Sequence, residues 1–238
     1  MLPNITHHGA VSGVTGSCHQ YQAADVNLLI DCGLFQGKEA DVDLADFGFD
    51  VSKVDALVVT HCHIDHVGRI PWLIAAGFRG PIYCTEPTAA LLSVVLKDAL
   101  EINLDRNHRL VEAALTRIES QIVALPFKDW FALNVNVKIR MQNAGHILGS
   151  AYIEIDALLE SNEHHRTVFS GDLGSPGAVF VDPVQSPERA DTLVIETTYG
   201  DKNHTDRSSR ETTLAKLINH AMRDSGTLLI PAFSLGRT

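Results

Sequence analysis

The sequence lacks any uninterrupted apolar run of the roughly 20 residues that a helix needs to cross a bilayer. Its N-terminus also lacks a basic segment followed by an apolar one, which is the pattern of a secretory signal. Cysteine is scarce: the four cysteines are scattered without paired spacing, as is typical of reduced thiols in a chain without a signal peptide. We therefore expect a cytoplasmic protein with no membrane partner.

The chain also has fewer basic residues than acidic ones. The chain has 19 lysine and arginine residues against 29 aspartate and glutamate residues, which gives a formal net charge of −10. A protein that binds nucleic acid normally presents a basic surface to the phosphates. The composition therefore argues mildly against a nucleic-acid partner.

The 238 residues, 45% of them hydrophobic, are enough for one sizeable core, or for one domain and part of another. Apolar runs alternate with helical patterns along the chain, which is typical of an α/β layered domain. The expected strands cover residues 26–30, 55–60, 81–84, 135–141, 166–170, 190–195 and 227–230, and the expected helices cover residues 66–76, 86–104, 110–125 and 208–224.

Three histidines and an aspartate stand together directly after the expected strand 55–60. They are His61, His63, Asp65 and His66, in the pattern His-x-His-x-Asp-His. Neutral imidazole and carboxylate are ligands that zinc prefers, and manganese or iron also suits such a mixed site. The alternative is a solvated polar turn in which histidines occur by chance, but four fixed positions in six residues favour a metal site.

Further acidic and imidazole side chains follow other expected strands. His146 and Asp172 each come shortly after a strand and beside glycine, where the backbone can approach closely. They supply the histidine and the bridging carboxylate that a two-metal site still needs. Asp31, at the end of strand 26–30, either caps a turn or orients a ligand histidine.

The segment Thr60–Pro71 resembles the metal motif of the metallo-β-lactamase fold superfamily. Residues 29–33, 143–150 and 171–174 are similar to the first, third and fourth motifs of the same superfamily. The resemblance implies an αββα sandwich, an α+β fold in which two sheets are packed between helices.

The C-terminal segment resembles one particular branch of this superfamily. The stretch from Glu196 to His204, followed by residues 231–238, is similar to the opening of the β-CASP insertion of the RNA- and DNA-processing branch. Glu196 matches the acidic motif of that branch. The resemblance therefore implies a metallo-β-lactamase domain over residues 1–205 and the beginning of a β-CASP domain over residues 206–238, with the later β-CASP histidines beyond Thr238.

The resemblance also implies roles for these side chains in a site with two zinc ions. Asp65 would additionally orient the attacking water or take its proton, Glu196 would belong to a proton relay, and Asp31 would support a ligand histidine. By position, His61, His63 and His146 would hold the first ion, Asp65 and His66 would hold the second, and Asp172 would bridge the two.

The implied reaction is phosphodiester hydrolysis by hydroxide formed from water at zinc, with single-stranded RNA as the expected substrate. Two alternatives remain open: a small-substrate metallo-hydrolase of the thioesterase or lactamase type, and an inactive fragment or binding subunit. With part of the second zinc site beyond Thr238, residues 1–238 alone are expected to have two unequal metal sites and little or no nuclease activity. Uncovered apolar surface is expected to favour self-association, with a homodimer as the simplest form.

Overall fold

The computed structural model describes residues 1–103, 107–176, 180–203, 208–223, 226–231 and 235. The chain divides into two units, Met1–Glu196 and Thr197–Thr238, and each is described by itself. No helix among the described residues has the length and apolar character needed to cross a membrane. The boundary expected between residues 205 and 206 stays a prediction.

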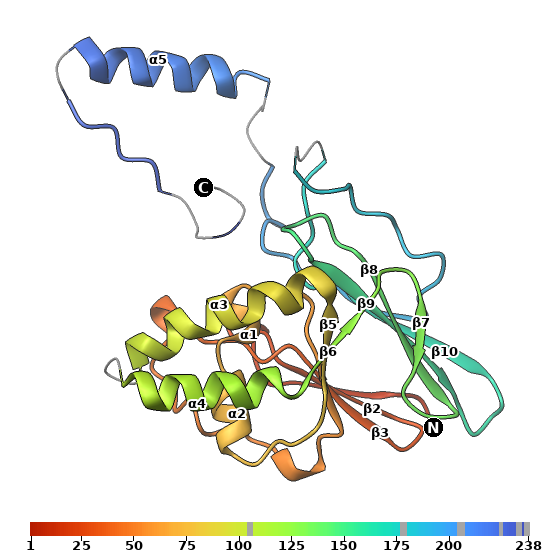
Figure 1. The fold of residues 1–238 in the computed structure, drawn as a ribbon. Helices are drawn as coiled ribbons and strands as arrows, with labels where there is room; N and C mark the ends of the chain where they lie inside the picture. The colour runs from red at the N-terminus through yellow and green to blue at the C-terminus, as the bar shows by residue number, and fades with distance from the viewer. Residues whose placement is uncertain (104–106, 177–179, 204–207, 224–225, 232–234, 236–238) are drawn as a thin grey trace. The chain divides into compact units, whose positions relative to one another are not determined.

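The first unit contains a six-stranded sheet (Figure 1). Its first three strands pair antiparallel and the last four pair parallel, so the chain enters this sheet as a meander and continues through helical crossovers. In spatial order the strands are β1 (Asn4–His7), β2 (His19–Ala23), β3 (Val26–Ile30), β4 (Ala56–Val58), β5 (Ile82–Thr85) and β6 (Ile122–Leu125).

A five-stranded sheet forms the second half of this unit. All its neighbours pair antiparallel except β10 and β11, which pair parallel. In spatial order the strands are β11 (Thr192–Val194), β10 (His164–Phe169), β9 (Ala151–Leu158), β8 (Val137–Asn143) and β7 (Trp130–Ala132).

The two sheets pack face to face over one apolar core. Alternate residues of β8 and β9 point inward, among them Ile139 and Ile153, and they join Leu28 and Val58 of the first sheet in a single cluster. The other face of the first sheet is covered by helices (Figure 1). In chain order they are α1 (Ile64–Val67), α2 (Ile70–Ala75), α3 (Glu86–Asn103) and α4 (His108–Glu119), with short 3-10 turns at Gly37–Glu39 and Val51–Lys53.

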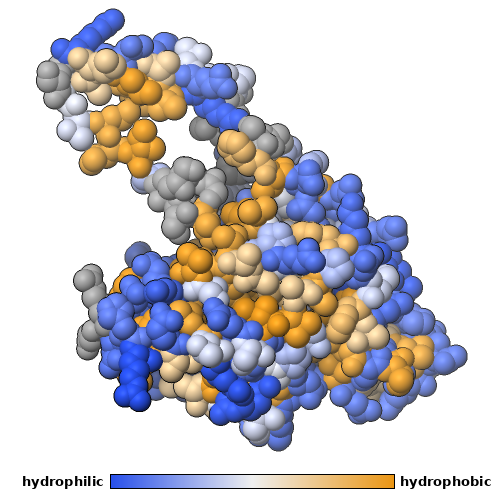
Figure 2. Space-filling model, in the orientation of Figure 1, coloured by the Kyte–Doolittle hydropathy of each residue, from blue (hydrophilic) through white to orange (hydrophobic). Residues whose placement is uncertain are grey.

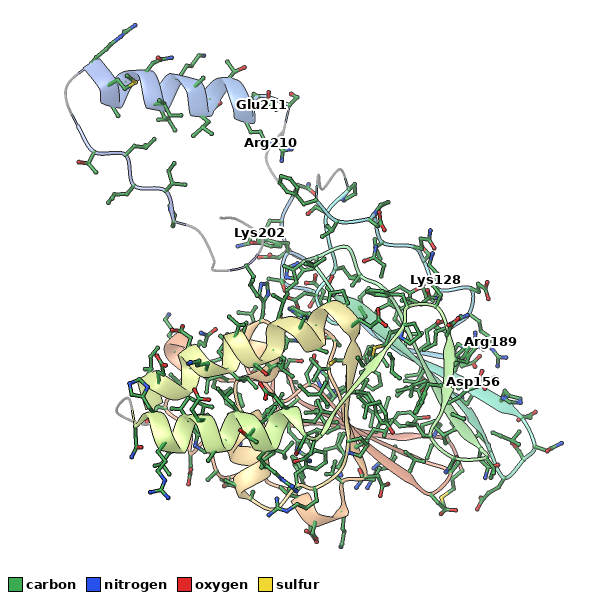
Figure 3. The ribbon with its side chains drawn as sticks, in the orientation of Figure 1. Lys128, Asp156, Arg189, Lys202, Arg210 and Glu211 are labelled. Carbon is green, nitrogen blue, oxygen red and sulfur yellow. The ribbon has the colours of Figure 1, made fainter. Side chains whose placement is uncertain are left out.

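The outward face of the second sheet carries charged side chains held in pairs. Asp156 on β9 is only 4% exposed and accepts a hydrogen bond of 2.6 Å from Nη2 of Arg166. Arg189 donates to the backbone oxygen of His164 at 2.8 Å, and its charge also acts on Asp156 (Figure 3). The guanidinium of Arg166 lies 4.9 Å from the centre of the Trp130 ring. These contacts satisfy a buried carboxylate on a face that strand alternation alone would leave to solvent.

The second unit contains α5 (Arg210–Arg223), whose apolar side chains are largely exposed (Figure 2). Leu217 is 51% exposed and Met222 is 77% exposed, and Leu229 beyond the helix is 84% exposed. The self-association expected from such a surface stays a prediction.

The α+β architecture with two sheets is confirmed, but several expected elements differ. The helix expected over 110–125 ends at Glu119, because residues 122–125 form β6 beside β5. The helix expected over 66–76 is two helices, α1 and α2. The strand expected over 227–230 is wrong: these residues have no strand partner among the described residues, and a strand needs one for its backbone hydrogen bonds.

Candidate metal centre

The His61–His66 segment begins where the parallel strand β4 ends. The neighbouring strand β3 runs in the same direction, so the residues that follow the two strands meet at one edge of the sheet. Asp31 follows β3, and its backbone N–H donates to the carbonyl of Val58 at 3.0 Å. The parallel pairing therefore brings Asp31 beside the histidine segment, although 29 residues or more separate them along the chain.

The loop that carries His146 joins β8 to β9 and is fixed at both ends. The hydroxyl of Ser150 accepts hydrogen bonds from the backbone N–H groups of His146 and Ile147, at 3.0 and 3.1 Å. The hydroxyls of Thr85 and Thr88, at the start of α3, donate to the carbonyl of Gly149 at 2.7 and 3.0 Å. This threonine pair ties the loop from the second sheet to a helix that packs on the first.

The loop that carries Asp172 follows β10 and touches the His146 loop. The backbone N–H of Gly174 donates to the carbonyl of Ala144 at 2.8 Å, and a side chain at Gly174 would meet the carbonyl oxygen of Gly145 at 1.6 Å. The carboxylate of Glu196 accepts from the N–H of Leu173 at 3.1 Å. The position of Asp172 is thus constrained by the contacts of the two residues that follow it.

Three imidazoles and one carboxylate converge among these loops. Ligand atoms of His61, His63, His146 and Asp172 all lie within 4.8 Å of one another. Nδ1 of His63 is 3.1 Å from Nε2 of His61 and 3.2 Å from Nε2 of His146. Oδ2 of Asp172 is 3.5 Å from Nε2 of His146 and 3.8 Å from Nε2 of His61. We call these four residues the first ligand group.

The other carboxylate oxygen of Asp172 faces a second set of donors, and we call Asp65, His66 and Asp172 the second ligand group. Nε2 of His66 is 3.2 Å from Oδ1 of Asp172 and 3.9 Å from Oδ2 of Asp65. The two oxygens of Asp172 therefore face different groups, which is the arrangement that a bridging carboxylate requires. The second group offers one imidazole and two carboxylates, so it is the smaller donor set.

Burial and neighbouring charges set the protonation of these side chains. Burial and the charges of neighbouring imidazoles lower the pKa of His61 well below its ordinary value, and they also lower the pKa of His63. Burial raises the pKa of Asp65. Burial likewise opposes charge on His66 and Asp172, but their mutual ion pair and a second carboxylate beside His66 outweigh it. The pKa of His66 is consequently raised well above its ordinary value and the pKa of Asp172 is lowered.

The first ligand group fits a transition metal such as zinc. Nitrogen ligands roughly 2.0–2.1 Å from a tetrahedral zinc ion lie about 3.4 Å apart, close to the 3.1 and 3.2 Å between ring nitrogens here. Metal ligands must be deprotonated, and the lowered pKa values of His61 and His63 favour the neutral imidazole. The donor set therefore needs little rearrangement to bind an ion.

The structure brings six of the eight site residues expected from the sequence into the two ligand groups. The other two lie one layer further out: Asp31 contacts His66, and Glu196 contacts the backbone beside Asp172. The roles of all eight residues stay predictions. A further residue beside the site is Thr60, whose hydroxyl lies 3.0 Å from Nδ1 of His61. Its place directly before the motif is the only sign of this contact in the sequence.

Comparisons with known proteins agree with this geometry. The family described as "Metallo-beta-lactamase superfamily" matches residues 13–136, which include the His61–His66 segment. The chain is 37% identical to "Ribonuclease TTHA0252" of Thermus thermophilus, over 98% of this chain and 52% of that protein. It is 32% identical to "Transcription termination factor FttA" of Cenarchaeum symbiosum and 28% identical to "Integrator complex subunit 11" of Gallus gallus, over 98% of this chain in each case.

The chain spans about half the length of the first of these relatives, and 37% and 40% of the length of the other two. The similarity nonetheless extends past residue 136 to His146 and Asp172, because each alignment covers almost the whole chain. The family match, the two packed sheets and the convergent histidines agree with one another. This chain belongs to the metallo-β-lactamase superfamily.

Proposed function

We propose that this chain carries the metal centre of a hydrolase that cleaves phosphodiester bonds in single-stranded RNA, in the β-CASP branch of the superfamily. The observation that carries the proposal is the carboxylate of Asp172, whose two oxygens face two separate ligand groups at 3.2 and 3.5 Å. Two adjacent metal sites that share a carboxylate suit the attack of water on a phosphodiester. Three relatives support the choice of substrate, since their names refer to a ribonuclease, a transcription termination factor and an Integrator subunit.

In this proposal the first ligand group holds one zinc ion and the second holds another. The bound ions would supply Lewis acidity and would lower the pKa of bound water towards about 7. Asp65 would take a proton from the attacking water, a role that is supported by burial, which raises the pKa of its carboxyl. Asp31 holds Nδ1 of His66 at 2.7 Å, and Glu196 supports the Asp172 loop and joins a proton relay.

The net charge of −10 stands against an RNA substrate, and two features reduce the conflict. Divalent cations at the site reverse the sign of the local charge, so the overall charge is a poor guide to the potential at the site. The chain also covers only part of each relative, so the activity is proposed for the protein that contains these residues and not for residues 1–238 alone.

The proposal is tested by metal analysis and by substrate choice. Purified without chelators, the protein should contain zinc in elemental analysis, and the longest protein expressed from its gene should cleave a labelled single-stranded RNA. Nitrocefin and glutathione thioesters should remain intact. His63→Ala and Asp172→Asn should abolish RNA cleavage, whereas the matched changes His108→Ala and Asp50→Asn, at exposed positions outside the site, should not.

Turnover of a thioester or lactam that is lost in the His63 and Asp172 variants would replace the nuclease by a small-substrate hydrolase. A protein that binds zinc but cleaves none of these substrates would support a binding subunit. Absence of any transition metal would remove the proposed chemistry altogether.

A further inference from the structure

We propose that Thr60 is a positioning residue, through whose hydroxyl Asp31 orients a histidine of the first ligand group as well as one of the second. Asp31 contacts His66 of the second group directly, and the Thr60 hydroxyl lies between Asp31 and His61 of the first group. One buried carboxylate would thereby fix the ring tautomer of a histidine in each group.

Asp31 is held rigidly enough for this role. It is 1% exposed, and its φ of 61° lies in the left-handed region, which aspartate tolerates better than most residues. Its Oδ1 accepts the backbone N–H of Thr60 at 2.8 Å. Its Oδ2 accepts the hydroxyls of Thr60 and Ser17, at 2.9 and 3.2 Å, and faces Nδ1 of His66 at 2.7 Å. The backbone N–H and the two hydroxyls can all donate to a carboxylate, which can only accept.

The protons in this network can be assigned from the chemistry of the groups. The Thr60 hydroxyl has a single proton, and the carboxylate of Asp31 can only accept, so the hydroxyl donates to Asp31. Two ring nitrogens also lie near this hydroxyl: Nδ1 of His61 at 3.0 Å and Nδ1 of His66 at 3.5 Å. Because its proton goes to Asp31, the hydroxyl must accept at the shorter of these contacts, which places the ring proton of His61 on Nδ1. Asp31 fixes the proton on Nδ1 of His66 in the same way.

The same tautomer is expected for both histidines whenever their rings are neutral. Nε2 of His61 faces His63 and Asp172 in the first group, and Nε2 of His66 faces Asp172 and Asp65 in the second. A proton held on Nδ1 leaves the Nε2 lone pair of a neutral ring available to an ion. Thr60 thus does for His61 what Asp31 does for His66.

Packing fixes the orientation of the Thr60 hydroxyl. Thr60 is 1% exposed, and its carbonyl accepts the N–H of Ala151 at 2.8 Å. A side chain at Gly171 would meet Cβ, Oγ1 and Cγ2 of Thr60 at 2.8, 2.9 and 3.1 Å, so the loop leading to Asp172 closes over this threonine. The close approach of this loop limits the space in which the Thr60 side chain can turn away from Asp31 and His61.

The first experiment needs no metal. Long-range ¹H–¹⁵N correlation spectra of the metal-free protein, recorded at pH 8, distinguish protonated from unprotonated ring nitrogens of each histidine. The wild-type protein should show His61 with its proton on Nδ1. Thr60→Val should shift His61 to a mixture of tautomers or to the Nε2–H form, and Thr60→Ser, which restores the hydroxyl, should return it to Nδ1–H.

The matched control is Thr167→Val, a buried threonine on β10 outside the site, which should leave the spectrum of His61 unchanged. A wild-type His61 with its proton on Nε2, or a Thr60→Val protein that keeps the proton on Nδ1, would overturn the proposal. The wild-type spectrum can refute the proposal even if Thr60→Val fails to fold, because a proton on Nε2 of His61 already contradicts it.

The consequence for metal binding rests on the proposed function and is measured separately. Zinc titration should show the affinity of the first ligand group falling about 10- to 100-fold in Thr60→Val, with most of the loss recovered in Thr60→Ser. Equal zinc affinity in the wild-type and Thr60→Val proteins would overturn the positioning role. Failure of the wild-type protein to bind zinc would instead refute the proposed metal centre while leaving the tautomer result intact.

Discussion

The loops that carry His146 and Asp172 contact each other at Gly174, so we expect a substitution of Gly174 to disturb the metal site. A Cβ at this position would lie 1.6 Å from the carbonyl oxygen of Gly145, and real Cβ atoms essentially never come within 3.0 Å of such an atom. Gly174→Ala must therefore separate the two backbones by about 1.4 Å, the difference between these values. Metal sites tolerate distance errors of only about 0.2 Å. The change should thus pull Asp172 away from His146, whose facing atoms are now 3.5 Å apart.

We expect the zinc affinity of the first ligand group to fall about 10- to 100-fold in Gly174→Ala, which corresponds to a loss of about 1.4–2.8 kcal/mol of binding free energy. Competition titration against a chromophoric chelator measures this directly, and far-UV circular dichroism shows whether the fold persists. Gly200→Ala is the matched control, because a Cβ there would come no closer than 3.2 Å to a neighbouring atom. A folded Gly174→Ala protein with the zinc affinity of the wild type would refute the view that loop contact sets the site.

Three further predictions concern the surroundings of the site. Glu196→Gln keeps an oxygen that can accept the N–H of Leu173, so its zinc affinity in titration should stay within about 3-fold of the wild type, while RNA cleavage should fall if Glu196 relays protons. Glu196→Ala removes this acceptor and should weaken zinc binding about 10-fold. Equal zinc affinity in the two variants would show that the contact with Leu173 does not support the site. Arg69 is 3% exposed and donates to two loop carbonyls, so Arg69→Met should lower the free energy of unfolding in urea by about 3 kcal/mol; a loss below about 1 kcal/mol would contradict this. Burial lowers the pKa of His19 from 6.5 to about 4, so the unfolded chain binds the extra proton and stability should rise with pH between about 4 and 6.5, by at most about 3 kcal/mol. His19→Gln should flatten that part of the pH dependence of urea unfolding relative to the wild type.

Much of the site could be predicted from the sequence because its donors follow strand ends. The His61–His66 pattern lies within six residues, so its convergence needs no knowledge of the fold. His146 and Asp172 could be added because each follows an apolar run and neighbours a glycine. The structure shows these segments in contact through Gly145 and Gly174, which strand-end position alone could only suggest.

Other features could not be predicted, because they depend on which elements become neighbours. The role proposed for Thr60 requires β3 and β4 to pair in parallel, which places Asp31 beside a residue far along the chain. The sequence of β6 predicts the end of a helix, because a short apolar run fits a helix or a strand equally well until β5 is known to lie beside it. The threonine pair at the start of α3 has an ordinary helix-capping sequence and gives no sign that it also holds the carbonyl of Gly149.

The distances within the site depend on the packing of the two sheets. Donors come from both sheets: His61 and His66 follow β4 in the first, whereas His146 and Asp172 follow β8 and β10 in the second. Buried residues of a single core cluster stand shortly before the loops that hold the donors and their support, namely Ile30, Val58, Met141 and Phe169. Because interiors are close-packed and transmit strain, a change in this core alters the separation of the two sheets and of the donors they carry. A metal ion that binds only the folded arrangement also raises the free energy of unfolding. Changes in the packing of the two sheets should therefore alter both metal affinity and protein stability.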